Sequence, residues 1–199
     1  MYYKIAKIVS FIVGVESFLV MVGWIMHIDA LTRVLPSGIN MKFPTALIFF
    51  LSAWNLYFIT KHTENNDKNT RLMILVTSFS VFLTMFLLLI STSLGIHTSI
   101  ESLFLLPFNS LNSFGEGSPA IPTMVNFVLF GLAGVCTFFR STGKYGRLKF
   151  FGYPILIIGL GIVIGYVFKL PWLSYQFDAN VIPMAFNTAL SFVLLGAGL

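Results

Sequence analysis

Residues 182–199, IPMAFNTALSFVLLGAGL, repeat a phrase that is already present at residues 39–54, INMKFPTALIFFLSAW. In both, Pro or Asn followed by Thr precedes an apolar run with a Phe and, later, a small residue. A third version begins at Pro122 with PTMVNFVLFGLAG. Pro fits the first turn of a helix, where its missing N–H is no loss, and Asn and Thr are good N-caps. The sequence therefore predicts three helices that begin alike.

The composition indicates an integral membrane protein. The 199-residue chain is 57% hydrophobic and only 10% charged, with 22 Phe residues, whereas a soluble domain carries about 25% charged residues. We expect the lipid bilayer to surround the chain, as a multi-pass protein of the cell inner (plasma) membrane. The first apolar run is too long for the apolar part of a signal peptide, and no small-residue cleavage site follows it.

The apolar residues are gathered into six segments, which lie at about residues 5–28, 44–60, 72–96, 122–139, 150–168 and 185–199. Such segments cross a bilayer as helices, because the hydrocarbon core offers no water to satisfy the backbone. The predicted fold class is an all-α membrane protein with six transmembrane helices. They form one domain over residues 1–199, built from three repeated helical hairpins at about 5–60, 72–139 and 150–199. The last segment, of about 15 residues, is ~8 Å short of a ~30 Å core.

The positive charges are distributed unequally between the connections. Nine of the 12 Lys and Arg residues fall on one side: Lys4, Lys7, Lys61, Lys68, Arg71, Arg140, Lys144, Arg147 and Lys149. The other side has Arg33, Lys42 and Lys169. Because Lys and Arg accumulate in cytoplasmic connections, we expect both termini in the cytoplasm. This placement accounts for the net charge of +5, so nucleic acid is not an expected partner.

Over nearly its whole length the chain resembles the hydrophobic, membrane-integral N-terminal sensory region of bacterial and archaeal sensor histidine kinases and diguanylate cyclases. That family repeats a pattern close to P-x-M-x-x-N-T-A-L-x-F in each hairpin. The third hairpin fits best, and it matches at Pro183, Met184, Asn187, Thr188, Ala189, Leu190, Phe192 and Gly196. The first hairpin departs at Pro44, and the second at Pro122, Met124 and Val125.

The resemblance implies a sensory domain for a small or membrane-partitioned signal, with no catalytic role and no cofactor. It also implies that the last helix relays the signal to a cytoplasmic kinase or cyclase module after Leu199. The full-length protein is then expected to be a homodimer.

Glu16 is the acidic residue that lies deep in an apolar segment, ~16 Å along the helix from its cytoplasmic end. An ionised carboxylate at that depth is costly unless it is paired. We predict that its partner is Asn55, which lies at comparable depth in the second segment. The pair is a candidate ligand anchor or proton-linked switch, and the alternative is a purely structural hydrogen bond between helices.

Other candidate residues lie toward the outer face. His27 and His97 end two outgoing helices, with Asp29 and Glu101 nearby, but their spacing supplies no local metal motif, so no metal site is expected. Aromatic residues at this depth line an apolar pocket or form an interfacial belt. The candidate ligand-binding residues are Glu16, Trp24, His27, Asn55, His97, Trp172, Tyr175, Asn187 and Thr188.

Two further features concern packing. Cys136 lies inside an apolar run and is predicted to be a small buried hydrophobe. Gly161 and Gly165 form a G-x-x-x-G pattern, which is typical of close helix–helix approach, within the domain or between two copies.

The sequence leaves other functions open. A transporter or channel usually needs several polar groups or broken helices in the membrane, and here Glu16, Asn55 and scattered Ser and Thr are the polar groups available. A membrane enzyme would need a metal motif or a nucleophile beside a base, and we recognise none in the sequence. The main alternative to a sensor is an accessory subunit of a larger membrane complex.

Overall fold

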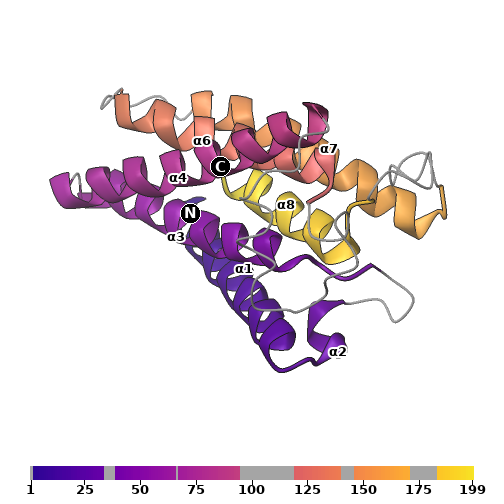
Figure 1. Cartoon of the computed structure of the whole chain (residues 1–199). Helices are drawn as coiled ribbons and strands as arrows, with labels where there is room; N and C mark the ends of the chain where they lie inside the picture. Colours follow the sequence, from indigo (N-terminus) through magenta and orange to yellow (C-terminus); the bar gives the residue numbers. More distant parts are fainter. Residues whose placement is uncertain (1, 34–38, 66, 95–118, 140–145, 171–182) are drawn as a thin grey trace.

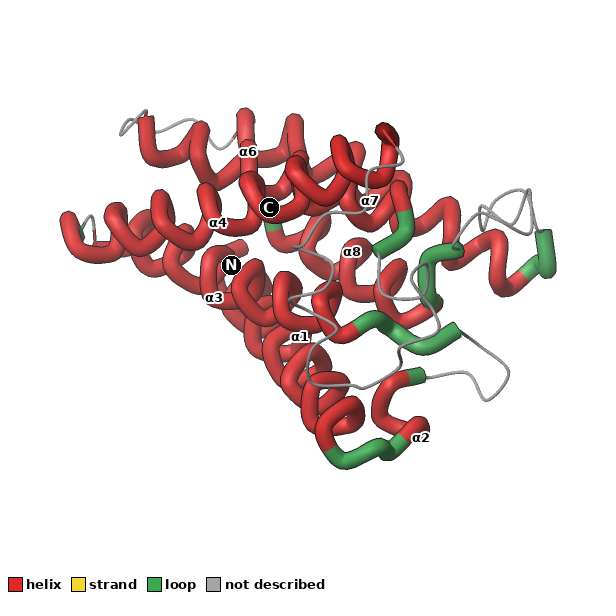
Figure 2. Tube along the Cα trace, in the orientation of Figure 1, coloured by secondary structure: helices red, strands yellow, loops and turns green. Residues whose placement is uncertain are grey.

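In the computed structural model, residues 2–33, 39–65, 67–94, 119–139, 146–170 and 183–199 are described, and all regular structure in these ranges is helical (Figures 1 and 2). The helices are α1 (Tyr2–Ile25), α2 (Asp29–Thr32), α3 (Phe43–Asn65), α4 (Lys68–Leu94), α6 (Ile121–Phe139), α7 (Gly146–Val167) and α8 (Phe186–Gly198). The prediction of an all-α fold is confirmed.

Five helices, α1, α3, α4, α6 and α7, contain stretches that are long and apolar enough to cross a membrane. These stretches have 18 to 27 residues. The chain thus has the helices of a multi-pass membrane protein. Helix α8 is apolar but has only 13 residues, so the sixth crossing and the orientation of the chain stay predictions.

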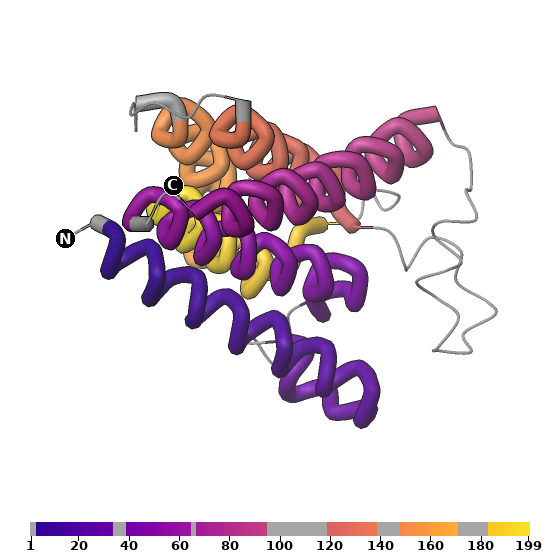
Figure 3. Tube along the Cα trace, turned by 90° about the vertical axis from the view of Figure 1, so that its left-hand side faces the viewer, coloured from indigo at the N-terminus to yellow at the C-terminus, as the bar shows by residue number. Residues whose placement is uncertain are grey.

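Helices that follow one another pack in pairs. Helix α1 packs on α3, α4 on α6, and α7 on α8, while contacts between α3 and α4, α6 and α7, and α1 and α8 close the ring. Figure 3 shows both chain termini at one end of the bundle. Helices α3, α6 and α8 begin at the other end, which we call the junction end.

Three phenylalanines form the centre of this arrangement. Phe49 of α3, Phe127 of α6 and Phe192 of α8 are fully buried, and their ring centroids lie 4.6 to 4.7 Å apart. Each lies five residues after the Pro or Asn that marks its repeat. Such tilted and edge-to-face pairs contribute about 0.5–1.5 kcal/mol each beyond the apolar area they bury. The repeat in the sequence therefore becomes a three-sided contact between equivalent rings.

Within each pair of helices, the small residue of the repeat marks a close approach. A Cβ atom on Gly131 would lie 2.9 Å from Cα of Phe82, and one on Gly196 would lie 2.7 Å from the backbone nitrogen of Leu156. In the first pair Ala53 takes this place, 3.5 Å from a Cβ built on Gly14. Small residues thus let each returning helix pack closely against its outgoing partner.

Two glycines of α7 let it pack closely against α8 within the domain. Cβ atoms on Gly152 and Gly159 would lie 2.8 Å from the carbonyl oxygen of Gly196 and 3.0 Å from that of Ala189, both in α8. Close approach was expected at Gly161 and Gly165, whereas the closest contacts described between α7 and α8 lie earlier along the helix.

The prediction for Cys136 was wrong, because its side chain is exposed on α6.

The expected capping chemistry is also corrected. Asn187 is the second residue of α8, and the cap is Ala185, which makes no side-chain capping hydrogen bond. The Asn187 carboxamide oxygen instead accepts the N–H of Thr188 at 3.1 Å. Pro44 and Pro122 likewise occupy the second positions of α3 and α6. The apolar residue before each of these positions is already helical, so each helix begins one residue earlier than the Pro or Asn of its repeat.

Replacing Gly131 by Ala should destabilise the fold by roughly 1–3 kcal/mol, the usual cost of overpacking, because the new methyl group meets backbone atoms of Phe82. The measurement is thermal unfolding of the purified protein in detergent. Gly14→Ala is the matched control, since its Cβ meets only an ordinary contact at 3.5 Å. Equal loss of stability in both variants would contradict this account.

Candidate functional site at the junction end

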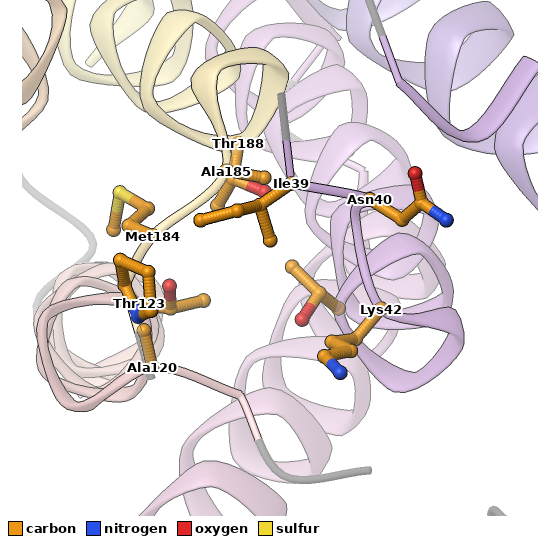
Figure 4. Close-up of a pocket in the computed structure, with 10 residues that line it drawn as sticks. Ile39, Asn40, Lys42, Ala120, Thr123, Met184, Ala185 and Thr188 are labelled. Carbon is orange, nitrogen blue, oxygen red and sulfur yellow. The ribbon is translucent and has the colours of Figure 1, made fainter. Parts of the chain in front are cut away.

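A small hollow opens between the first turns of α3, α6 and α8 (Figure 4). Its free volume is about 10 Å³, which is about the space that one water molecule needs. The lining residues come from the ends of three helices and the segments before them: Ile39, Asn40, Lys42, Thr45, Ala120, Thr123, Pro183, Met184, Ala185 and Thr188.

Three threonines at equivalent positions of the repeat line this hollow. Thr45, Thr123 and Thr188 are each only 2% exposed. Each threonine lies in the first turn of its helix, where backbone N–H groups have no partner within the helix. The sequence selected only Thr188 as a candidate, although the position of Thr in all three repeats identifies the other two.

Aromatic side chains fix the backbone that leads into two of these helices. The indole Nε1 of Trp24 donates to the carbonyl oxygen of Met41 at 2.8 Å, and the hydroxyl of Tyr166 donates to that of Met184 at 2.7 Å. Met41 and Met184 both lie three residues before the Pro or Asn of their repeats. Trp24 was predicted as a ligand contact, and the structure gives its indole N–H this backbone partner.

The backbone of His27 forms part of the C-terminal ending of α1. It adopts a left-handed conformation with φ of 56°, and Lys169 does the same at the end of α7 with φ of 54°. Behind them, the N–H groups of Ile28 and Leu170 each reach back 2.8 Å to a glycine carbonyl oxygen, which is the Schellman ending of a helix. The imidazole of His27 is exposed and lines neither the hollow nor the groove described below.

Glu16 has a partner that differs from the predicted one. The hydroxyl of Ser191 in α8 donates to Oε2 of Glu16 at 2.6 Å. Asn55 instead donates through Nδ2 to the hydroxyl of Ser78 in α4 at 2.7 Å. Depth along a helix was readable from the sequence, but which neighbouring helix each side chain faces was not. The prediction that Asn55 pairs with Glu16 was therefore wrong.

Asn187 joins the junction end to the segment after α1. Its side-chain Nδ2 donates to the carbonyl oxygen of Thr32 at 3.4 Å, and that same oxygen accepts the N–H of Met41 at 2.9 Å. Asn187 is buried. It positions the start of α8 and does not line the hollow, whereas its neighbour Thr188 does.

A second cavity lies on the face shared by α1 and α3. This groove has a volume of about 660 Å³ and is lined mainly by apolar and aromatic side chains: Lys7, Ser10, Phe11, Gly14, Val15, Phe18, Phe50, Ala53, Trp54 and Tyr57. Its long side chains are largely exposed, with Phe11 at 72% and Trp54 at 49%. In a bilayer this face meets lipid tails or another apolar molecule.

Three of the predicted site residues, His97, Trp172 and Tyr175, lie outside the described residues. The possible metal group of two histidines and two acids falls partly there too, since it includes His97 and Glu101. Asp29 forms an ion pair with Arg33 at 3.6 Å. Within the described ranges no group of three His, Cys, Asp or Glu residues gathers that could hold a metal ion.

Comparison with protein-family models, with curated proteins and with solved structures gave no match for this chain.

Tyr166→Phe should lower the free energy of unfolding by about 0.5–1.5 kcal/mol, because it removes one partly buried hydrogen bond while keeping the ring. Tyr153→Phe on the same helix is the control, since Tyr153 is 61% exposed. Thermal unfolding of both variants gives the comparison. A Tyr166→Phe protein as stable as the wild type would show that the bond to Met184 is not significant.

The hydrogen bond between Glu16 and Ser191 can be measured with a double-mutant cycle. We expect Glu16→Ala and Ser191→Ala to be less than additive, with a coupling free energy of about 0.5–1.7 kcal/mol, as for other hydrogen bonds between membrane helices. Unfolding of the two single variants and the double variant supplies the four free energies. Strict additivity would mean that the two side chains do not interact.

Proposed function

We propose that this chain is a membrane-integral sensory domain that detects a small or membrane-partitioned signal and relays it through α8 to a cytoplasmic kinase or cyclase module. The observation that carries the proposal is the contact between Glu16 and Ser191. It connects α1, which forms one wall of the apolar groove, to α8, the last helix of the chain.

The groove supplies a place for the signal. Gly14, Val15 and Phe18 line it and are neighbours of Glu16 on α1. An apolar molecule that enters between α1 and α3 displaces this part of α1 and thereby acts on the bond to Ser191. A ligand shifts such an equilibrium only by the difference in its affinity for the two arrangements.

Helix α8 is suited to transmit such a shift. Besides its buried face around Phe192, it makes specific contacts with the rest of the bundle, namely Ser191 to Glu16, Asn187 to the carbonyl of Thr32, and Gly196 to Gly152. Small translations or rotations of a helix held in this way are a common signalling movement. Its end at Leu199 approaches Val9 and Leu56 through Gly198, where a Cβ would meet them at 3.3 and 2.9 Å, so α8 also contacts the groove-bearing pair near the chain end.

The groove also supports a second candidate function, that of an accessory subunit of a larger membrane complex. An exposed apolar groove of this size would also accept a helix of another membrane protein, as expected of an accessory subunit. A transporter gains less support, because the centre between α3, α6 and α8 is filled by Phe49, Phe127 and Phe192.

The relay can be tested by joining residues 1–199 in frame to the dimeric cytoplasmic part of a histidine kinase and measuring autophosphorylation in membranes. We expect Ser191→Ala and Gly14→Leu, which fills the groove, to change the output at equal expression. The control is Ser80→Ala on the exposed face of α4, where the hydroxyl bonds only within its own helix.

The length of the connection between Leu199 and the kinase offers an independent readout. Inserting one to four residues after Leu199 should change the output with a helical period of about 3.6 residues. An output that neither the variants nor the insertions alter would contradict the relay and favour an accessory subunit, for which co-purification from membranes is the next measurement.

A further inference from the structure

We propose that the apolar groove between α1 and α3 binds one long-chain carboxylate, that is, a free fatty acid with a single alkyl chain. The inference names the ligand of the groove, and it rests on the proposed function only where it makes that ligand the signal. Binding itself follows from three properties of the groove, which are the distribution of its polar groups, the charge at one of its ends and its volume.

The polar lining of the groove is gathered at the end away from the junction. Helices α1 and α3 run in opposite directions, so that Lys7 pairs with Glu64 near this end and Gly14 approaches Ala53 farther along. The polar lining residues lie from the first of these levels to the second: Lys7, Ser10 and Tyr57. On the junction side of the second level the lining is apolar: Val15, Phe18 and Phe50. A groove with one polar end and a longer apolar part suits an amphipathic ligand.

The charge at the polar end favours an anion. Lys4 precedes Lys7 by three residues on α1, and Lys61 follows Tyr57 by four on α3, so the groove-lining face of each helix continues to a lysine. The acid of these two helices at this end is Glu64, which pairs with Lys7 at 2.6 Å. An ammonium group has three N–H donors, so Lys7 can donate to Glu64 and to a bound carboxylate together. Three lysines against one glutamate favour a negatively charged head group.

The volume sets the size of the ligand. At ~30 Å³ per non-hydrogen atom, the share of one water molecule in the liquid, the groove volume of about 660 Å³ holds roughly 20 such atoms. The lining from Lys7 to Phe18 extends ~17 Å along α1. A carboxylate with one long alkyl chain, such as palmitate or stearate, has this size. A phospholipid, with two chains and a larger head group, does not fit as a whole.

The head group decides the selectivity of the groove. Phe11 and Trp54, which form its rims, are exposed by 72% and 49%, and in a bilayer any lipid tail covers them. Lipid tails are as apolar as the side chains they touch, so burial of the chain alone gives little preference. A fatty acid is therefore distinguished from other lipids by its carboxylate at the Lys7 end.

Trp54 provides the readout. The full chain in nanodiscs of zwitterionic phospholipid is titrated with dibromostearic acid, whose bromine atoms quench tryptophan fluorescence on contact, at a mildly alkaline pH that ionises the acid. We expect quenching that saturates. The methyl ester of the same acid carries no charge and should quench only in proportion to its amount in the bilayer. Trp54→Phe, which keeps an aromatic rim, should remove the saturating part.

Charge variants test the head-group site in both directions. Lys7→Gln should raise the half-saturating concentration about two- to fivefold, the effect of a partly exposed charge pair, whereas Glu64→Gln removes a competing carboxylate and should lower it. Gly14→Leu fills the groove and should abolish saturation. The matched control is Lys68→Gln at the first residue of α4, since Lys68 is exposed and does not line the groove.

Saturating quenching by the methyl ester, or equal effects of Lys7→Gln and Lys68→Gln, would overturn a carboxylate as the ligand. Quenching of the wild type that stays proportional to the acid would overturn the site and leave the groove to bulk lipid or to another helix. The comparison of acid with ester uses the wild-type chain, so it decides even where a variant does not fold.

Binding and signalling fail separately. An acid that binds but leaves the output of the kinase fusion unchanged would support this site and contradict the proposed function. An output that responds to Ser191→Ala and to the insertions after Leu199, without saturating quenching, would support the relay and overturn the fatty-acid site.

Discussion

The contact between Phe49, Phe127 and Phe192 is the constraint on which the rest of the structure depends. The rings are fully buried and stand 4.6 to 4.7 Å apart, so α3, α6 and α8 must meet at one level. Since each ring lies four residues after a repeat threonine, that level also brings Thr45, Thr123 and Thr188 together. The hollow is therefore a consequence of the hydrophobic contact beneath it.

The outgoing helices α1, α4 and α7 pack around this centre through short-range contacts. Gly131 and Gly196 allow backbone approach, and Trp24 and Tyr166 bond to the chain that leads into α3 and α8. At the end away from the junction, Lys7 pairs with Glu64 at 2.6 Å, and Arg71 donates to the carbonyl oxygen at the end of α6. The exposed Lys7–Glu64 pair adds little free energy, but both contacts join neighbouring helix ends.

The two cavities lie on different parts of the bundle and differ in size and lining. The hollow is small and is lined by residues at the starts of three helices, whereas the groove between α1 and α3 is large and apolar. Glu16 and Ser191 connect the groove wall to α8, and Thr188, one turn earlier on the same helix, belongs to the hollow. Helix α8 is thus bonded to the helix that forms the groove wall and also lines the hollow.

The sequence by itself determined the apolar helices, their approximate ends and the threefold repeat, because hydropathy and turn residues act locally. It also identified Glu16, Asn187 and Thr188 as residues of interest. Only the tertiary structure decided that Glu16 faces Ser191, that Asn55 faces Ser78, and that three threonines share one hollow. The physical reason is that sequence fixes the depth of a side chain along its helix, whereas the direction it faces depends on how all the helices pack.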